Sequence, residues 1–264
     1  MTKSSQNNAP TDDETAPRRR VDILLLERGL ASSRDRARDL ILAGKVLASG
    51  VVVKKPSKHC SVTAELTVTG TVNPWVSRAG LKLAGGLAAF PGITVAGKVA
   101  LDIGASTGGF TDVLLANGAR CVMAVDVGTG QLHERLVADP RVIVMDGVNA
   151  RHLEASMLAA TPDIIVCDAS FISLRKLLPA ALRLAPAGAG FIGLIKPQFE
   201  VGRGSVGKGG VVRDANLHAS IVADIETWLK RDMGWRHIGT APSPIDGPDG
   251  NREFLIAGQK PTEA

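Results

Sequence analysis

The stretch that decides the fold reads Leu101-Asp-Ile-Gly104-Ala-Ser-Thr-Gly108-Gly109-Phe110. An apolar run of the kind that forms a buried strand leads into a glycine-rich turn, and the residues after Gly109 have the pattern of an amphipathic helix. Glycines let a ligand approach the backbone, and the first turn of a helix offers unpaired N–H groups. The stretch therefore predicts a strand, a ligand-binding loop and a helix in succession.

Similar apolar runs recur after Gly80 and alternate with helix-like stretches. Alternation of this kind is typical of an α/β domain with a parallel, doubly wound sheet. In such sheets the ligand lies beyond the carboxyl ends of the strands, so the residues just after each run are candidates for function. The predicted strands are 99–103, 121–125, 142–144, 164–167, 191–195 and 253–256.

The spacing of the glycines weakens two nucleotide-binding alternatives. A dinucleotide fingerprint requires glycine at 106, where the chain has Ser106, and a phosphate-binding P-loop requires a lysine after Gly109. The stretch resembles instead the Asp-x-Gly loop of class I methyltransferases, a Rossmann-like fold that binds S-adenosylmethionine. The resemblance implies these cofactor-binding residues: Asp102, Gly104, Ala105, Ser106, Gly108 and Gly109.

Two more acids stand where the next predicted strands end. Asp126 follows Asp102 by twenty-four residues, and Asp146 closes the third run. A carboxylate at 126 can accept hydrogen bonds from both hydroxyls of a ribose, and Asp146 is placed to reach the edge of an adenine. One acid after a strand is more often a loop residue or helix cap. Three acids at three strand ends favour a nucleoside cofactor.

A second glycine-rich segment, 202–209, matches the first part of a phosphate-loop motif. Gly209 stands where that motif needs Ser or Thr, and neither a strand before it nor a helix after it is indicated. The segment is therefore interpreted as a mobile glycine lid.

Basic residues are concentrated near the N-terminus. Residues 18–60 hold eleven Lys or Arg against four acids, a local charge of +7, whereas residues 61–264 are neutral. This block predicts a helix at 21–29, a second helix capped by Ser33, and a hairpin around Ser49-Gly50. Basic residues recur on the second helix and at both ends of the hairpin, which favours a phosphate-binding surface.

Composition excludes several protein classes. Three widely spaced cysteines provide neither a disulfide framework nor a zinc motif, so no metal is expected and a reducing cytoplasm fits. The polar N-terminus is unlike a signal peptide, and no apolar run is long enough to span a membrane. Aromatic residues make up only 3% and include no Tyr, which argues against base stacking as the main mode of nucleic-acid binding.

Four residues suggest group-transfer chemistry. Lys196 follows the fifth predicted strand, although lysines are almost never fully buried unless paired, and Lys82 is a possible second cation beside it. Asp168, after the fourth strand, and Glu253, on the last, are expected to orient the two lysines. A lysine amine so placed can take the proton from a ribose 2′-hydroxyl as it attacks a methyl group.

These residues carry a resemblance to known families. Lys82, Asp168, Lys196 and Glu253 occur in the order of the catalytic tetrad of FtsJ-like ribose methyltransferases. The strings Ser170-Phe-Ile-Ser-Leu and Lys196-Pro-Gln-Phe-Glu-Val-Gly resemble the TlyA family, some of whose members are labelled hemolysins, and residues 18–66 resemble an S4 RNA-binding domain. The resemblance implies an α+β S4-like domain followed by a Rossmann-like domain with a doubly wound, mostly parallel sheet.

The same resemblance implies a function. It predicts S-adenosylmethionine-dependent 2′-O-methylation of cytidine in ribosomal RNA, free or within ribosomal subunits, and no membrane partner. The basic residues expected to hold RNA are Arg20, Arg34, Lys45 and Lys55. Asn73 departs from the Arg-x-Trp-Val linker of family members. The predicted organisation is a disordered tail at 1–17, the S4-like domain at 18–66, a linker at 67–76, the methyltransferase domain at 77–258 and a tail at 259–264.

Two alternatives stay open at this point. A non-catalytic rRNA assembly factor would use the basic module and a vestigial cofactor fold, although the tetrad residues are intact. A cytolysin would need a signal peptide, a spanning helix or an apolar patch on a basic helix, and the sequence offers none of these. The oligomeric state is also open.

Overall fold

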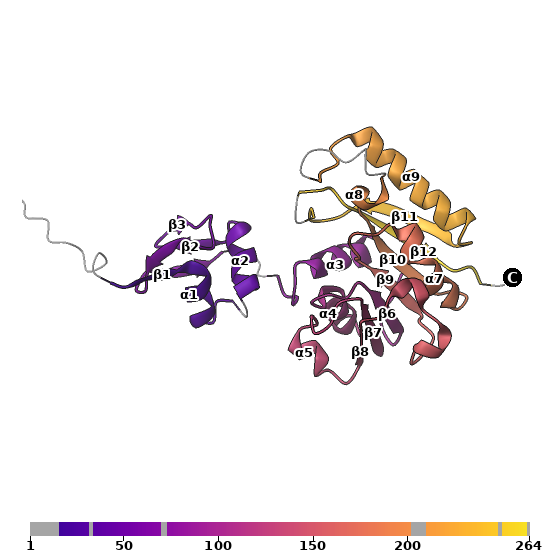
Figure 1. Cartoon of the computed structure of the whole chain (residues 1–264), viewed down its shortest axis with the longest axis horizontal. Coiled ribbons are helices and arrows are strands. Elements are labelled where there is room, and N and C mark those ends of the chain that lie inside the picture. The colour runs from indigo at the N-terminus through magenta and orange to yellow at the C-terminus, as the bar shows by residue number, and fades with distance from the viewer. Residues whose placement is uncertain (1–15, 32–33, 70–72, 202–209, 248–249, 263–264) are drawn as a thin grey trace, which may run out of the picture. The chain divides into compact units, whose positions relative to one another are not determined.

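The computed structural model describes residues 16–31, 34–69, 73–201, 210–247 and 250–262 (Figure 1). The chain separates into two compact units, Met1–Pro74 and Trp75–Ala264. Three predictions lie outside the described residues: most of the N-terminal tail, the Ser33 cap and the glycine lid at 202–209.

The smaller unit contains the two helices and the hairpin that the sequence predicts. Gly29 and Gly44 follow the two helices with positive φ, and Ser49-Gly50 makes the hairpin turn with φ of 47° and 78°. A separate apolar core holds the unit together. Its elements are β1 (Arg18–Arg20), α1 (Val21–Glu27), α2 (Arg34–Leu42), β2 (Val46–Ala48), β3 (Val51–Val52), β4 (His59–Ser61) and β5 (Leu66–Val68).

Two small antiparallel sheets organise this unit. β1 pairs with β4, and β2 lies between β3 and β5. Because β5 runs to Val68 and pairs with β2, residues 67 and 68 belong to the folded unit, although the sequence placed them in a linker.

The larger unit is built on a seven-stranded sheet in the order β11-β12-β10-β9-β6-β7-β8. Figure 1 shows helices on both sides of it. The strands are β6 (Val99–Ile103), β7 (Cys121–Asp126), β8 (Val142–Asp146), β9 (Ile164–Cys167), β10 (Gly190–Ile195), β11 (Arg236–Pro242) and β12 (Phe254–Gln259). The α-helices are α3 (Ala79–Ala89), α4 (Gly109–Ala116), α5 (Glu134–Val137), α6 (Leu174–Leu177), α7 (Pro179–Leu184), α8 (Pro197–Glu200) and α9 (Ala215–Arg231), with short 3₁₀ turns at Ala150–His152 and Ala155–Met157.

Side-chain alternation along the strands makes the sheet doubly wound. Leu101 and Ile103 of β6 pack in one cluster with α6, α7 and α9, whereas Ala100 packs on the opposite face with α3 and α4. The sheet therefore separates two apolar cores, as a Rossmann-like fold requires.

The sheet is mostly parallel, as predicted, and its antiparallel pairs are those of β12. β12 runs antiparallel to both β10 and β11, and β11 is absent from the predicted strands. Its sequence mixes arginine, histidine, glycine and threonine and so lacks an apolar run. Because β12 is antiparallel, it begins at the edge where the parallel strands end, and Phe254 pairs with Ile195 there. β12 also extends to Gln259, one residue into the predicted tail.

A buried carboxylate ties β6 to α4 beneath the glycine-rich loop. Asp102 is fully buried, and Thr111 Oγ1 donates a hydrogen bond of 2.7 Å to its Oδ2. Among the described residues, its Oδ1 has no hydrogen-bond partner. Burial raises the pKa of Asp102 to about 7, although the bond from Thr111 acts in the opposite direction.

Within the described ranges, no helix is long and apolar enough to cross a membrane.

The raised pKa of Asp102 predicts that the free energy of unfolding decreases as pH rises. The contribution of Asp102 is fully present below its unfolded-state pKa near 3.8 and is lost as pH rises towards about 7. Asp102→Asn removes it, so the variant should gain unfolding free energy relative to wild type by about 1 kcal/mol per pH unit between pH 5 and 7. Urea unfolding followed by tryptophan fluorescence measures this, because Trp75, Trp228 and Trp235 all lie in the larger unit.

The exposed Asp232→Asn serves as a matched control and should follow the wild-type pH profile. If the Asp102→Asn and wild-type stabilities stay parallel across this range, the predicted titration of Asp102 is wrong.

Candidate active site and RNA-binding surface

The glycine-rich loop opens onto a cavity of about 660 Å³ beyond the carboxyl ends of β6, β7 and β9. Its wall is partly apolar, and a few polar groups converge on it, as in many small-molecule sites. The lining residues are Ile103, Gly104, Ser106, Val125, Asp126, Val127, Gly128, Gln131, Val148, Asn149, Ala150, Arg151, Asp168, Ala169, Ser170, Phe171, Ile172 and Leu177.

The loop conformation depends on Gly104 and on Asp126. Gly104 has φ of +79°, and a Cβ there would lie 2.9 Å from the Ala169 Cα, so only glycine fits. The backbone N–H groups of Ser106 and Gly128 donate to the two Asp126 carboxylate oxygens, both at 2.8 Å. Asp126 thereby fixes two loops, and the carboxylate retains lone pairs for further donors.

This cavity fits a nucleoside. Asp126 presents carboxylate oxygens that can accept from ribose hydroxyls, while Val127, Ile172 and Leu177 offer apolar contact for a base. Glycine backbone at 104 and 128 permits close approach. The donor set therefore suits S-adenosylmethionine, and no group of three or more potential metal ligands exists among the described residues.

The predicted cofactor residues divide into two groups. Gly104, Ser106 and Asp126 line the cavity, whereas Asp102, Ala105, Gly108, Gly109 and Asp146 are not among its lining residues. Asp146 Oδ2 instead accepts a 2.7 Å hydrogen bond from the Gly130 N–H, so it supports the loop after β7.

Sequence reasoning missed several lining residues. Gln131, Asn149 and Arg151 come from the segments after β7 and β8, and Phe171 comes from the loop after β9. The rule that ligands lie after strand ends indicates all three segments. No spacing motif marks the individual side chains, and for this reason they were not singled out.

The four residues of the predicted tetrad meet in the structure. Asp168 lies between the two lysines, with its Oδ1 2.7 Å from Lys196 Nζ and its Oδ2 3.4 Å from Lys82 Nζ. Glu253 Oε2 lies 2.6 Å from Lys82 Nζ. Two cations and two carboxylates thus form one continuous chain of ion pairs.

Each member of the tetrad comes from a different element. Lys82 lies on α3, Asp168 follows β9, Lys196 follows β10, and Glu253 precedes β12. Lys196 and Glu253 flank the Ile195–Phe254 pair, so the antiparallel register brings them to the same edge.

The two lysines are almost completely buried. Lys82 is 5% and Lys196 is 6% exposed, and Glu253 is 3% exposed. Ion pairing compensates for the loss of hydration. Lys196 Nζ also donates to Ser170 Oγ at 2.9 Å and to the Asp168 carbonyl oxygen at 3.3 Å. Asp168 and Ser170 also line the cavity, so the Lys196 amine lies next to residues of the cavity wall.

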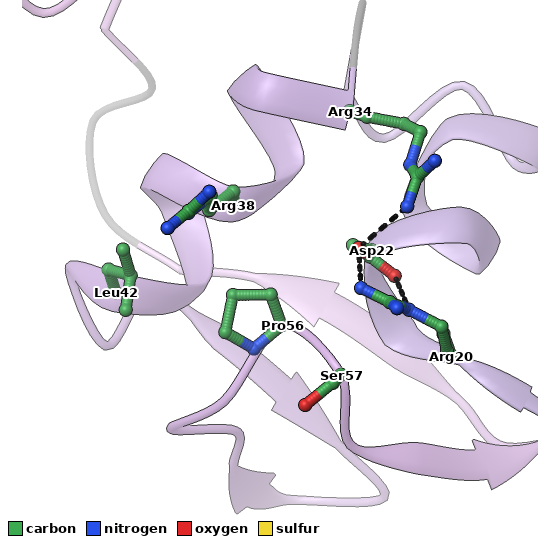
Figure 2. A pocket seen from close by; sticks show the side chains of 7 residues that line it. All are labelled: Arg20, Asp22, Arg34, Arg38, Leu42, Pro56 and Ser57. Carbon is green, nitrogen blue, oxygen red and sulfur yellow. Dashed lines mark hydrogen bonds and ion pairs between the residues drawn. The ribbon is translucent and has the colours of Figure 1, made fainter.

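The smaller unit contains a second cavity, of about 470 Å³, shown in Figure 2. Asp22 of α1 is buried at its side. It accepts hydrogen bonds from Arg20 at 3.0 and 2.7 Å and pairs with Arg34 at 3.5 Å. The bond from Arg20 is the main cause that lowers the pKa of Asp22, although burial opposes it. Arg38 completes the basic lining, with Leu42, Pro56 and Ser57 around it.

This cavity brings together only part of the predicted RNA-binding set. Arg20 and Arg34 line it, whereas Lys45 and Lys55 are not among its lining residues. Arg38, four residues after Arg34 on α2 and not among the predicted RNA-binding residues, lies in the wall. Arg38 is exposed and makes no ion pair with the residues that the structure describes. Three guanidinium groups against one carboxylate give the cavity a net positive charge.

Comparisons with known proteins agree with both units. An FtsJ-like methyltransferase model matches residues 75–260, and an S4 domain model matches residues 19–66. The chain is 48% identical over 242 residues to a protein of Mycobacterium tuberculosis named 16S/23S rRNA (cytidine-2′-O)-methyltransferase TlyA, covering 91% of this chain and 90% of that protein. It is 44% identical to the Bacillus subtilis putative rRNA methyltransferase YqxC, covering 92% of this chain and 86% of that protein.

A solved structure described as a putative hemolysin from Streptococcus thermophilus superposes with a TM-score of 0.74 at 40% identity. The match covers 94% of this chain and 90% of that one. The two domain models occur in the expected order, and the similarity to the named relatives extends over nearly the whole chain. This chain therefore belongs to the TlyA family of S4-domain, FtsJ-like methyltransferases.

Proposed function

We propose that the protein transfers a methyl group from S-adenosylmethionine to the ribose 2′-hydroxyl of a cytidine in ribosomal RNA. The observation that carries this proposal is the shared position of Asp168, which lines the nucleoside-sized cavity and holds the Lys196 amine at 2.7 Å. A base is thereby placed at the side of the cofactor site. The relatives named as rRNA cytidine methyltransferases support the choice of substrate.

Lys196 acts as the general base. Bound S-adenosylmethionine supplies an electrophilic methyl group. Lys196 first releases its ammonium proton to solvent. The amine then accepts the proton of the 2′-hydroxyl while that oxygen bonds to the methyl carbon and the carbon–sulfur bond breaks. The ammonium that results lies beside the Asp168 carboxylate, which stabilises the new charge.

The other tetrad members orient this pair. Lys82 contacts the second oxygen of Asp168 and is held in turn by Glu253. Because these groups are buried, their mutual attraction is screened less than it would be in water. The chain of ion pairs therefore fixes the direction of the Asp168 carboxylate and, through it, the Lys196 amine.

The basic cavity of the smaller unit binds RNA phosphate. Arg20, Arg34 and Arg38 provide planar donors that match phosphate oxygens. Asp22 restrains Arg20 and Arg34 before RNA arrives, which reduces the entropy lost on binding. The scarcity of aromatic residues is consistent with recognition through phosphate and shape. Lys45 and Lys55 would extend the surface outside the cavity, and the substrate is free rRNA or an assembled ribosomal subunit.

Lys196→Ala should abolish methyl transfer because it removes the proton acceptor. Cofactor and RNA binding should remain close to wild type, since Lys196 lines neither cavity. Incorporation of tritium from labelled S-adenosylmethionine into ribosomal subunits measures transfer, and calorimetry with the cofactor measures binding.

Lys176→Ala, which removes an exposed lysine, is the control and should transfer normally. Ordinary turnover by Lys196→Ala would disprove the role of the base. Wild-type protein that binds subunits but transfers no label would favour a non-catalytic assembly factor.

Arg34→Ala combined with Arg38→Ala should weaken RNA binding and flatten its dependence on salt. Each phosphate contact that is lost lowers the slope of log K against log salt by about 1, because fewer counterions are released. Fluorescence anisotropy with an rRNA fragment at several salt concentrations gives the slope.

Lys230→Ala changes an exposed charge on α9 and is the matched control. An unchanged salt slope in the double arginine variant would exclude the cavity from phosphate binding.

A further inference from the structure

The loop after β9 and the segment after β10 contact each other at three places. At one end, Lys196 contacts Asp168 and Ser170. In the middle, the rings of Phe171 and Phe199 lie with centroids 5.2 Å apart. The other end is closed by Glu200, the last residue of α8, and the proposed mechanism gives this carboxylate no role.

Glu200 bridges the two segments with both of its oxygens. Oε1 accepts a 2.8 Å hydrogen bond from the Leu174 N–H, and Oε2 accepts a 2.6 Å hydrogen bond from Ser173 Oγ. Ser173 Oγ also accepts from the Arg175 N–H at 3.2 Å, so the bridge sits at the first turn of α6. Burial raises the pKa of Glu200, while these bonds and Arg175 oppose that rise. The two donors therefore compensate for only part of the cost of burying this carboxylate.

The backbone between the two ends of this loop is strained. Phe171 has φ of +66°, a left-handed conformation that is an outlier for a bulky residue, and its side chain is 90% exposed. Such a conformation persists only where its surroundings enforce it. The restraints on either side are the contacts of Lys196 with Asp168 and Ser170 and the contacts of Glu200 with Ser173 and Leu174.

We propose that Glu200 is a positioning residue for methyl transfer, which fixes the 168–173 loop so that Asp168 and Ser170 hold the Lys196 amine in its reactive place. This inference rests on the proposed function of Lys196. Lys196 and Glu200 lie at the two ends of one short segment that begins at the edge of the sheet. If the Glu200 end is released, the loop can shift relative to Lys196 while the Asp126 side of the cavity keeps its own hydrogen bonds.

Glu200→Ala tests the proposal by removing both hydrogen bonds. The expected result is a loss in single-turnover rate of about 10- to 100-fold, because small displacements of a catalytic group are costly. The KM for the cofactor should change much less than the rate, because the Asp126 side of the cavity keeps its own hydrogen bonds. Glu200→Gln should restore most of the rate, since its amide oxygen can accept from Leu174 and its amide N–H can donate to a lone pair of Ser173 Oγ.

Glu154→Gln, at an exposed acid, is the matched control for loss of a carboxylate. Wild-type rate in Glu200→Ala overturns the proposal, and so does a raised cofactor KM with an unchanged rate. If Glu200→Ala does not fold, Ser173→Ala removes one of the two bonds and should show an intermediate loss of rate, whereas a wild-type rate there would again contradict the proposal. Absence of transfer by wild-type and Glu154→Gln protein would instead mean that the proposed function itself has failed.

Discussion

The site depends on one contact, the 2.7 Å ion pair between Asp168 and Lys196. An ammonium group that is 6% exposed can be tolerated only beside a carboxylate, and Asp168 supplies this carboxylate while also bordering the cofactor-sized cavity. The other tetrad members balance the charge of this pair. Lys82 also forms an ion pair with Asp168, and Glu253 forms an ion pair with Lys82. The four buried side chains together therefore have no net charge. Removal of any one member leaves an unpaired charge in the interior.

The sheet makes this contact possible by bringing distant parts of the chain to one edge. Asp168 and Lys196 leave neighbouring parallel strands at their carboxyl ends. Glu253 reaches the same edge from the opposite direction because β12 is antiparallel to β10. Two hydrogen bonds fix the loop after β6: Asp102 accepts from Thr111 of α4, and Asp126 accepts from the Ser106 N–H of the loop itself. A rigid scaffold thus holds loops whose own backbone, at Gly104 and Phe171, is in conformations that few residues adopt.

Much of this was predictable from sequence, for identifiable reasons. Six of the seven strands of the sheet contain apolar runs, and these runs indicated them. β11 was missed because it is an edge strand of mixed polarity. The tetrad was predicted by its order along the chain. Asp146 and Asp102 were expected near a cofactor, and that expectation stays a prediction: Asp146 accepts from a loop N–H group, Asp102 accepts from Thr111, and neither is among the residues that line the cavity. A residue's position after a strand predicts the edge of the sheet, not the direction of its side chain.

The sequence by itself determined the class of the fold, the two-part organisation and the residue types available for chemistry, since all of these follow from local patterns of apolar, glycine and charged residues. Only the tertiary structure decided which of those residues meet. It placed Asp168 between two lysines, joined Glu200 to Ser173, and put Arg38 beside Arg20 and Arg34 while Lys45 and Lys55 lie elsewhere. The physical reason is that strand register, strand direction and side-chain rotamers are set by packing among residues distant in sequence, and a local pattern contains no information about that packing.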